Sequence, residues 1–456
     1  MTLLDLLADH PFGDDDVLVH TVDRSLTKAE VIDQVTTLGR RLTRETPEAC
    51  AVAIVGDGLA ALVGMFACWH AERVFVPINP RQPASAIDDA VERINAAATV
   101  VRDVIEPHEP NQPKELPADT AMMLWTSGTT STPKPILHAH AAYRELIDRV
   151  LAPLKGAPNT AQRWPPSPNL IPVSLALNAG IYNALFGLRA GAPLVLMDRF
   201  STAEFTTLVQ RHQIRSTVLP PAAIAMLNDD TTIDSLAPLR YVRSITAPLS
   251  PFQATRFTER FDAFVLNSYG QAEIGEVIGW TSADARAHPD KIGAAGRPHA
   301  GVDVTIDQPD ANNVGQLLVR PPNHAVDLTP DRLTNDGYIR TGDLARVDPE
   351  GFVWIEGRLS DLINRGGNKV FPDEVEEVLA AVPGVTEVSV VGRPDDRLGQ
   401  VPVAVIVGDA PNEALESAAR AHLVAYKVPV AFVRRAELPR SEAGKVLRRQ
   451  LVEELS

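Results

Sequence analysis

A hydroxyl-rich segment that ends in a lysine is the part of this sequence best suited to chemistry. An apolar run ending at Thr126 leads into Ser127-Gly-Thr-Thr-Ser-Thr-Pro-Lys134, which carries five hydroxyl side chains, one glycine and the lysine. Backbone N–H groups, hydroxyl donors and a positive charge can together surround phosphate groups. The glycine spacing excludes the G-x-x-x-x-G-K-[ST] nucleotide loop, and a solvated Ser/Thr turn stays open as the alternative.

Three further segments carry amide, aromatic and charged side chains that could bind a ligand. Asn267-Ser-Tyr-Gly-Gln-Ala-Glu273 combines an amide, an aromatic ring and a carboxylate, Asp343 ends Tyr338-Ile-Arg-Thr-Gly-Asp, and Lys445 follows a glycine near the C-terminus. An amide offers hydrogen bonds and a ring a flat face, carboxylates can hold a hard cation or hydroxyl groups, and an ammonium can stabilise negative charge. Considered singly, Asp343 also suits a cap and Lys445 a solvated surface charge.

Alternating strand and helix patterns must position these groups. Buried strands are predicted at residues 51–55, 74–77, 99–103, 122–125, 193–197, 216–219, 242–246 and 264–267. Helical periodicity lies between several of them, at 59–71 and 203–212, which indicates βα units and a parallel sheet. The fold class is therefore α/β, with a large N-terminal part of parallel or mixed sheets layered with helices.

The pattern changes to a smaller block after about Gly357. A helix is predicted to open at Pro372, followed by strands at 385–391 and 402–407 and a helix at 413–424. This block is predicted to form a second, α+β domain.

The composition indicates a globular protein and excludes several classes. The 456 residues, 45% of them hydrophobic, can bury the cores of two or three domains. A net charge of −15 argues against nucleic-acid or anionic-membrane partners. Two cysteines, no recognisable signal peptide and an apolar stretch at 59–70 that is too short to span a bilayer favour a cytoplasmic protein.

Other chemistries find weaker support. Gly56-Asp-Gly58-Leu-Ala-Ala61 resembles a dinucleotide-binding turn, but no acidic residue ends the next predicted strand, so we favour a tight turn between strand and helix. His138 and His140 could exchange protons, although a packing role is preferred. No Ser-His-Asp order supports a hydrolase.

Together, the motifs resemble those of the acyl-adenylate-forming superfamily, which includes acyl- and aryl-CoA ligases, luciferases and peptide-synthetase adenylation domains. The resemblance covers nearly the whole chain and rests on motifs that follow one another in family order, at 126–134, 267–273, 296–298, 338–343, 357–376 and 438–448. Ser131 and Pro135 stand where glycines are usual, and Ala272 stands where threonine is usual.

This resemblance implies a site for ATP and Mg²⁺. The β- and γ-phosphates would be held by Lys134 and by the loop residues Thr126, Ser127, Gly128, Thr129 and Thr130. Glu273 would bind Mg²⁺, with Thr126 as a second metal-site residue. Lys445 would bridge the α-phosphate and the substrate carboxylate during adenylation.

The nucleoside would be bound by a second set of residues. Asp343 would accept hydrogen bonds from the ribose hydroxyls, with Arg358 assisting. The adenine would lie against residues of one motif, namely Asn267, Tyr269, Gly270 and Gln271.

Domain movement is also implied. After pyrophosphate leaves, a mobile C-terminal domain, residues 360–456, would rotate against the N-terminal domain, residues 1–359, about a hinge at Ser360. The rotation would bring Gly366 and Gly367 to the site, where their missing side chains let the pantetheine arm of coenzyme A pass. A simple turn is the structural alternative for the two glycines.

The acyl pocket is expected around Leu175, Asn178, Ala247 and Gly275. Leu175 stands in place of a histidine common in the family, which predicts a small or medium apolar or aromatic acid.

The implied function is an AMP-forming ligase that uses ATP, Mg²⁺ and coenzyme A to convert a small carboxylic acid into a thioester. Transfer to an amine, or to a carrier protein in trans, uses the same activation step and stays open. Ser131, Pro135 and Ala272 also raise the alternative of a binding protein without catalysis. A monomer or a homodimer is expected.

Overall fold

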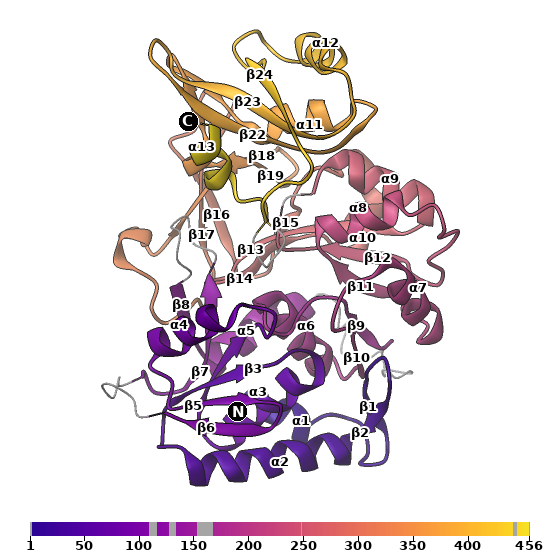
Figure 1. The fold of residues 1–456 in the computed structure, drawn as a ribbon, viewed down its shortest axis with the longest axis vertical. Helices are drawn as coiled ribbons and strands as arrows, with labels where there is room; N and C mark the ends of the chain where they lie inside the picture. The colour runs from indigo at the N-terminus through magenta and orange to yellow at the C-terminus, as the bar shows by residue number, and fades with distance from the viewer. Residues whose placement is uncertain are drawn as a thin grey trace.

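The computed structural model describes residues 2–108, 116–126, 134–152, 167–247, 249–440 and 445–455. Figure 1 shows the N-terminal sheets and helices at the bottom and the C-terminal part, in orange and yellow, at the top. Between them lie the strands that carry most of the predicted site.

A six-stranded sheet forms the base, with strand order β6-β5-β3-β4-β7-β8. Its inner strands are parallel, and β6 and β8 are antiparallel to their neighbours. The strands are β3 (Ala51–Val55), β4 (Val74–Ile78), β5 (Ala98–Val101), β6 (Val104–Pro107), β7 (Thr120–Thr126) and β8 (Lys134–Ala139). The helices of this region are α1 (Asp5–Ala8), α2 (Lys28–Glu45), α3 (Gly58–His70), α4 (Ala84–Ile94) and α5 (His140–Leu151).

A nine-stranded sheet follows, with order β15-β14-β13-β12-β11-β9-β10-β1-β2. Its strands are β1 (Val17–His20), β2 (Ser25–Thr27), β9 (Asn169–Ile171), β10 (Leu194–Leu196), β11 (Ser216–Leu219), β12 (Tyr241–Ser244), β13 (Phe264–Gln271), β14 (Gly275–Gly279) and β15 (Arg297–Pro298). The accompanying helices are α6 (Asn178–Arg189), α7 (Thr202–Arg211), α8 (Pro221–Asp229), α9 (Pro251–Phe261), α10 (Ser282–Ala287) and η2 (Pro289–Lys291).

Two smaller sheets complete the fold. The first is antiparallel and contains β16 (Asp303–Asp307), β17 (Gly315–Arg320), β18 (Ile339–Val347) and β19 (Val353–Arg358), with η3 (Pro330–Arg332) before β18. After η4 (Leu359–Asp361), the second contains β20 (Ile363–Arg365), β21 (Asn368–Val370), β22 (Val385–Asp395), β23 (Gly399–Gly408) and β24 (Ala431–Arg435). It packs with α11 (Pro372–Ala380) and α12 (Asn412–His422) around its own buried apolar cluster. α13 (Arg448–Leu455) packs against β22 and β23 in a second, smaller cluster, through Leu451.

The α/β fold class and the parallel pairing are confirmed, with some strand ends shifted by local geometry. The strand predicted at 99–103 ends at Val101, because Arg102 and Asp103 have positive φ angles of 47° and 65° and form the turn into β6. β13 extends beyond the predicted 264–267, because its second half pairs with β14. The antiparallel sheet β16–β19 was not predicted.

The turn between β3 and α3 confirms the interpretation of the glycine pair as a tight turn. The Asp57 carboxylate accepts hydrogen bonds from the backbone N–H groups of Gly58, at 2.9 Å, and Leu175, at 2.8 Å. Its other oxygen pairs with Arg81 Nη2 at 2.8 Å. Asp57 therefore caps the helix and ties together segments from both large sheets.

His138 is also structural. Its ring lies fully buried in β8, donates a hydrogen bond from Nε2 to the Ala272 carbonyl at 2.9 Å and packs edge-on against Tyr143. Burial lowers the pKa of His138 to about 4, so the ring is neutral at pH 7. His140 begins α5, and its Nδ1 accepts from the Leu3 N–H at 3.2 Å.

No helix in the described ranges is long and apolar enough to cross a membrane.

Replacing Asp57 with alanine should lower the free energy of unfolding by about 1–3 kcal/mol, because two backbone donors and an arginine lose their acceptor. Denaturation with urea measures the change. Asp57→Asn, which keeps an oxygen for the backbone donors, should cost less. A wild-type transition for Asp57→Ala would contradict the assignment.

Candidate active site

The C-terminal lysine lies beside charged residues of two other sheets. Burial lowers the pKa of Lys445, the positive charge of Arg358 lowers it further, and the carboxylates of Asp343 and Glu273 oppose the shift. Charges that shift a pKa lie in the surroundings of the titrating group, so Lys445 faces the same site as these three residues. In Figure 1 the yellow segment after β24 descends toward β13 and β15. The residues predicted at opposite ends of the sequence are therefore brought together.

Asp343 is the buried centre of this cluster. It lies opposite Arg358 in the register of β18 and β19, and Arg358 Nε is 3.1 Å from Asp343 Oδ1. Asp343 Oδ2 accepts hydrogen bonds from the Tyr269 hydroxyl at 2.5 Å and from Gln271 Nε2 at 2.9 Å. Burial and the neighbouring carboxylate raise the pKa of Tyr269 well above its ordinary value, so the hydroxyl stays a donor.

Glu273 is held by an arginine that no motif predicted. Arg332 Nη1 is 2.6 Å from Glu273 Oε1, and Arg332 Nη2 donates to Gln271 Oε1 at 2.6 Å. The arginine ends a short 3-10 helix between β17 and β18. Nothing in its sequence surroundings marks it, because the contact depends on how the antiparallel sheet packs against β13.

The surroundings of Glu273 fit a magnesium ion bound together with phosphates. Mg²⁺ commonly takes one or two carboxylates and fills its other positions with phosphate oxygens and water. The Glu273 side chain is 18% exposed, so one carboxylate is within reach of a ligand. No group of three or more potential metal ligands occurs within the described ranges, so a stand-alone protein cage is not formed there.

The predicted adenine residues line up along β13. Asn267 is half-buried and lies opposite Ser244 of β12. Gly270 pairs with Glu276, and a Cβ at Gly270 would collide with the backbone carbonyl of Gly275. Glycine at this position is therefore required by the close approach of the two strands.

The predicted phosphate loop connects two paired strands. Thr126 is the last residue of β7 and lies opposite Lys134, the first residue of β8, whose side chain is exposed. Pro135 pairs with Trp125 one step further from the loop. Ser127, Gly128, Thr129, Thr130 and Ser131 lie outside the described residues.

Two of the four predicted acyl-pocket residues, Asn178 and Gly275, lie against the same helix, α5, and a third, Ala247, is partly exposed. The Asn178 Oδ1 accepts from the Tyr143 hydroxyl at 2.7 Å. A Cβ at Gly275, which has φ +64°, would lie 3.1 Å from Leu146, one turn after Tyr143 in α5. Ala247 is half-buried. The helix α5 thus connects Asn178 to Gly275.

Leu175 differs from the other three, since it is only 2% exposed and packs in the core. Beside Gly275, the structure also places polar groups that were not predicted. Arg243 Nη1 is 2.8 Å from Glu276 Oε1, and His299 Nε2 donates to the same oxygen at 2.9 Å. The surroundings of Gly275 are therefore less apolar than the sequence suggested.

Ser360 lies in η4, the connection between the two small sheets. Its hydroxyl donates to Asp361 Oδ1 at 2.9 Å. A cavity of about 320 Å³ is lined here by Thr341, Gly342, Arg358, Leu359 and Ser360. The predicted hinge thus borders Arg358, next to Asp343.

Gly366 and Gly367 form the turn between β20 and β21, with φ angles of 58° and 90°. The Gly367 N–H donates to Asn364 Oδ1 at 2.9 Å, and a Cβ on Gly367 would meet no atom within 4 Å. Space beside this glycine is therefore open, while its φ angle favours glycine in any case.

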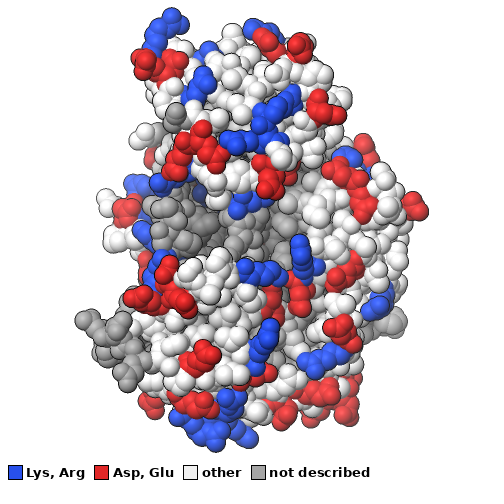
Figure 2. Space-filling view, in the orientation of Figure 1, with Lys and Arg blue, Asp and Glu red and all other residues white. Residues whose placement is uncertain are grey.

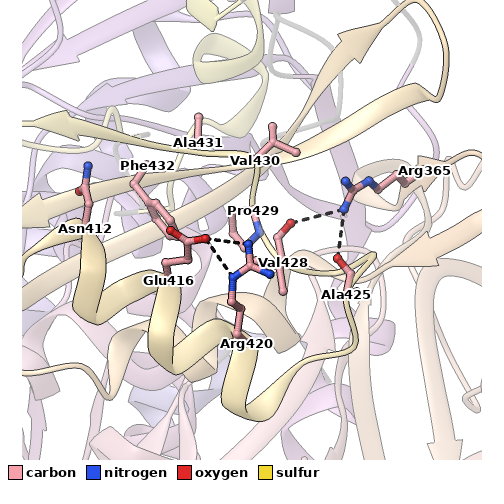
Figure 3. A pocket seen from close by; sticks show the side chains of 10 residues that line it. All are labelled: Arg365, Asn412, Glu416, Arg420, Ala425, Val428, Pro429, Val430, Ala431 and Phe432. Atoms are coloured by element: carbon pink, nitrogen blue, oxygen red, sulfur yellow. Dashed lines mark hydrogen bonds and ion pairs between the residues drawn. The ribbon is translucent and has the colours of Figure 1, made fainter.

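A second cavity, of about 410 Å³, lies within the C-terminal domain (Figure 3). Its charged groups bind one another or the backbone. Arg420 Nη2 is 2.7 Å from Glu416 Oε1, and Arg365 Nη1 donates to the Tyr426 carbonyl at 2.7 Å. The pair Arg420–Glu416 lies within α12, whereas the Arg365 contact holds the segment between α12 and β24 against β20.

Basic and acidic side chains both border the hollow between the C-terminal part and the larger lower part (Figure 2). Within the site, three cations, Arg332, Arg358 and Lys445, accompany two carboxylates, Asp343 and Glu273. The site can therefore receive an anionic ligand although the whole chain carries a charge of −15.

Residues 8–326 match the family of AMP-binding enzymes, and residues 374–445 match the AMP-binding enzyme C-terminal domain. The chain is 32% identical to a sulfoacetate–CoA ligase of Cupriavidus necator over 392 residues, covering 78% of this chain and 70% of that enzyme. It is 31% identical to a 2-succinylbenzoate–CoA ligase of Bacillus velezensis over 350 residues, covering 74% of this chain and 69% of that enzyme.

Two solved structures share the fold at low sequence identity. The ATP-bound MatB of Rhodopseudomonas palustris superimposes with a TM-score of 0.87 at 21% identity, covering 100% of this chain and 99% of MatB. The amide bond synthetase McbA of Marinactinospora thermotolerans gives a TM-score of 0.84 at 24% identity, covering 99% of both chains.

Replacing Arg358 with glutamine should raise the pKa of Lys445 toward its ordinary value, because a nearby positive charge is removed. Replacing Asp343 with asparagine should shift it the opposite way. NMR titration of ¹³C-dimethylated lysines, with Lys445→Arg to assign the signal, measures both shifts. Identical titration curves in the wild type and Arg358→Gln would show that the two groups are not neighbours in solution.

Proposed function

The chain belongs to the family of AMP-binding enzymes, and we propose that it activates a small carboxylic acid with ATP, releasing pyrophosphate, and then transfers the acyl group from the acyl-adenylate to coenzyme A. Relatives that are 32% and 31% identical over the aligned part of the chain are named as CoA ligases for sulfoacetate and 2-succinylbenzoate. The observation that carries the proposal is the position of Lys445 beside Asp343, Arg358 and Glu273.

Adenylation joins a carboxylate to the α-phosphate, so two anions must approach each other. In the proposed mechanism the Lys445 ammonium lies between them and stabilises the charge that develops on the phosphoryl oxygens. Asp343 accepts hydrogen bonds from the ribose hydroxyls, and Arg358 keeps that carboxylate oriented. Mg²⁺ bound by Glu273 would neutralise phosphate charge, with the segment from Thr126 to Lys134 holding the β- and γ-phosphates.

The thioester step needs a different arrangement, because the thiol of coenzyme A must reach the acyl carbon after pyrophosphate has left. We propose that residues 360–456 rotate about Ser360 against residues 1–359. The open space beside Gly367 supports a passage for the pantetheine arm next to Gly366. The proposed hinge residue Ser360 borders the cavity that Thr341, Gly342, Arg358 and Leu359 also line.

An amine acceptor is the alternative for the second step. Both reactions share the adenylate, and the fold likeness to an amide bond synthetase does not decide between them. Incubating the enzyme with ATP, an accepted acid and either coenzyme A or an amine, followed by mass spectrometry, distinguishes thioester from amide. A carrier protein added in trans completes the comparison. A cytoplasmic location and a monomeric or homodimeric state stay predictions.

A pyrophosphate-release screen over carboxylic acids, with and without coenzyme A, tests the proposed reaction. Release that depends on both ATP and an acid is expected. Small apolar, aromatic and dicarboxylic acids should be compared, since Arg243 and Glu276 lie beside Gly275. If no acid gives release although the protein binds ATP, a binding protein without catalysis becomes the better description.

Lys445→Ala should slow pyrophosphate release by about 100-fold or more, because a charge that stabilises the transition state is lost. Thioester formation from supplied acyl-adenylate should stay near the wild-type rate. Lys427→Ala is the matched control, since Lys427 lies in the same domain but pairs with Glu374. Unchanged pyrophosphate release in Lys445→Ala would refute the mechanism.

A further inference from the structure

Arg332 connects the two halves of the proposed nucleotide site, although it lies outside every motif identified in the sequence. It lies in η3. Its partners are Gln271 at the end of β13, Glu273 two residues further on, and Arg340 in β18. The Arg332 side chain is 23% exposed, so it is largely enclosed but still within reach of a ligand.

The guanidinium of Arg332 uses all three of its nitrogens. Nη1 pairs with Glu273 Oε1 and Nη2 donates to Gln271 Oε1, both at 2.6 Å. Nε donates to the Arg340 carbonyl at 3.2 Å. A planar group bound on three sides has little freedom to turn, so it fixes the positions of both side chains that it contacts.

The contact with Gln271 extends the effect to Asp343. With its oxygen directed at Arg332, the Gln271 amide presents Nε2 to Asp343 Oδ2 at 2.9 Å and to the Thr341 carbonyl at 2.8 Å. Without Arg332, the amide would lose the partner that distinguishes its oxygen from its nitrogen. One arginine therefore orients the proposed metal ligand and, through Gln271, the proposed ribose ligand.

We propose that Arg332 is a positioning residue of the nucleotide site, which holds Glu273 and Gln271 in the geometry that receives magnesium-bound ATP. The inference rests on the proposed function, because it assigns nucleotide binding to the surroundings of Glu273 and Asp343. It adds a residue from the β17–β18 connection to a site otherwise built from the motifs.

The variant Arg332→Lys separates the contact with Glu273 from the contact with Gln271. An ammonium can pair with Glu273 but cannot also make the in-plane bonds to Gln271 and the Arg340 carbonyl. Arg332→Lys should therefore restore part of the magnesium-dependent binding of ATP while leaving AMP binding weak. Arg332→Ala should weaken the binding of both nucleotides.

Isothermal titration calorimetry with AMP in the absence of metal, and with ATP in the presence of Mg²⁺, tests the proposal on the full chain. Arg332→Ala is expected to weaken AMP binding by about tenfold or more, the loss typical of a hydrogen bond network with charged groups. The KM for ATP should rise with it, while the KM for the acid stays within about twofold. The control is Arg320→Ala, which breaks an exposed pair with Asp303 in the same sheet.

The outcomes separate this inference from the proposed function. Wild-type protein that binds neither AMP nor ATP would overturn the proposed function itself. Wild-type protein that binds both, with equal affinity in Arg332→Ala or full recovery of AMP binding in Arg332→Lys, would overturn only the role of Arg332. If Arg332→Ala melts far below Arg320→Ala, Arg332→Gln takes its place, and an AMP affinity equal to that of the wild type in Arg332→Gln or in Arg332→Lys would overturn the role.

Discussion

The pairing of opposite charges at the junction of three sheets is the interaction on which the site depends. Asp343 and Glu273 would repel each other without cations between them. Partial burial strengthens both this repulsion and the attraction of each carboxylate to a neighbouring cation. Arg358, Arg332 and Lys445 supply the cations from β19, from the β17–β18 connection and from the C-terminal segment. When all five groups are ionised, one positive charge is in excess, which suits an anionic ligand in an otherwise acidic protein.

The sheets position these charges by extending from buried parallel strands into a more open region. β13 begins among buried neighbours in the nine-stranded sheet and ends as an antiparallel partner of β14, so its residues from Asn267 to Gln271 leave the core toward the site. The register of β18 and β19 places Asp343 opposite Arg358. Lys445 approaches from the far end of the chain, where α13 is tied to α11 through Arg448, whose Nη2 is 2.7 Å from Asp373 Oδ1.

Two of the departures from the family motifs lie at positions where the backbone contributes to the packing. Ala272 presents its carbonyl oxygen to His138, a contact that a threonine would make equally well, so the substitution removes a hydroxyl without changing this support. Pro135 lies in β8 opposite Trp125, outside the part of the loop that would approach phosphates. These placements are compatible with a working activation site.

The sequence by itself determined the α/β class, most of the parallel strands and the order of the motifs, because periodicity and glycine-rich turns are local properties of the chain. It also identified Asp343, Arg358, Glu273 and Lys445 as candidates. Only the tertiary structure decided that Lys445 lies beside the other three, that Arg332 joins Glu273 to Gln271, and that Leu175 belongs to the core. Those facts depend on how sheets far apart in sequence pack against each other, and no local pattern encodes such long-range contacts.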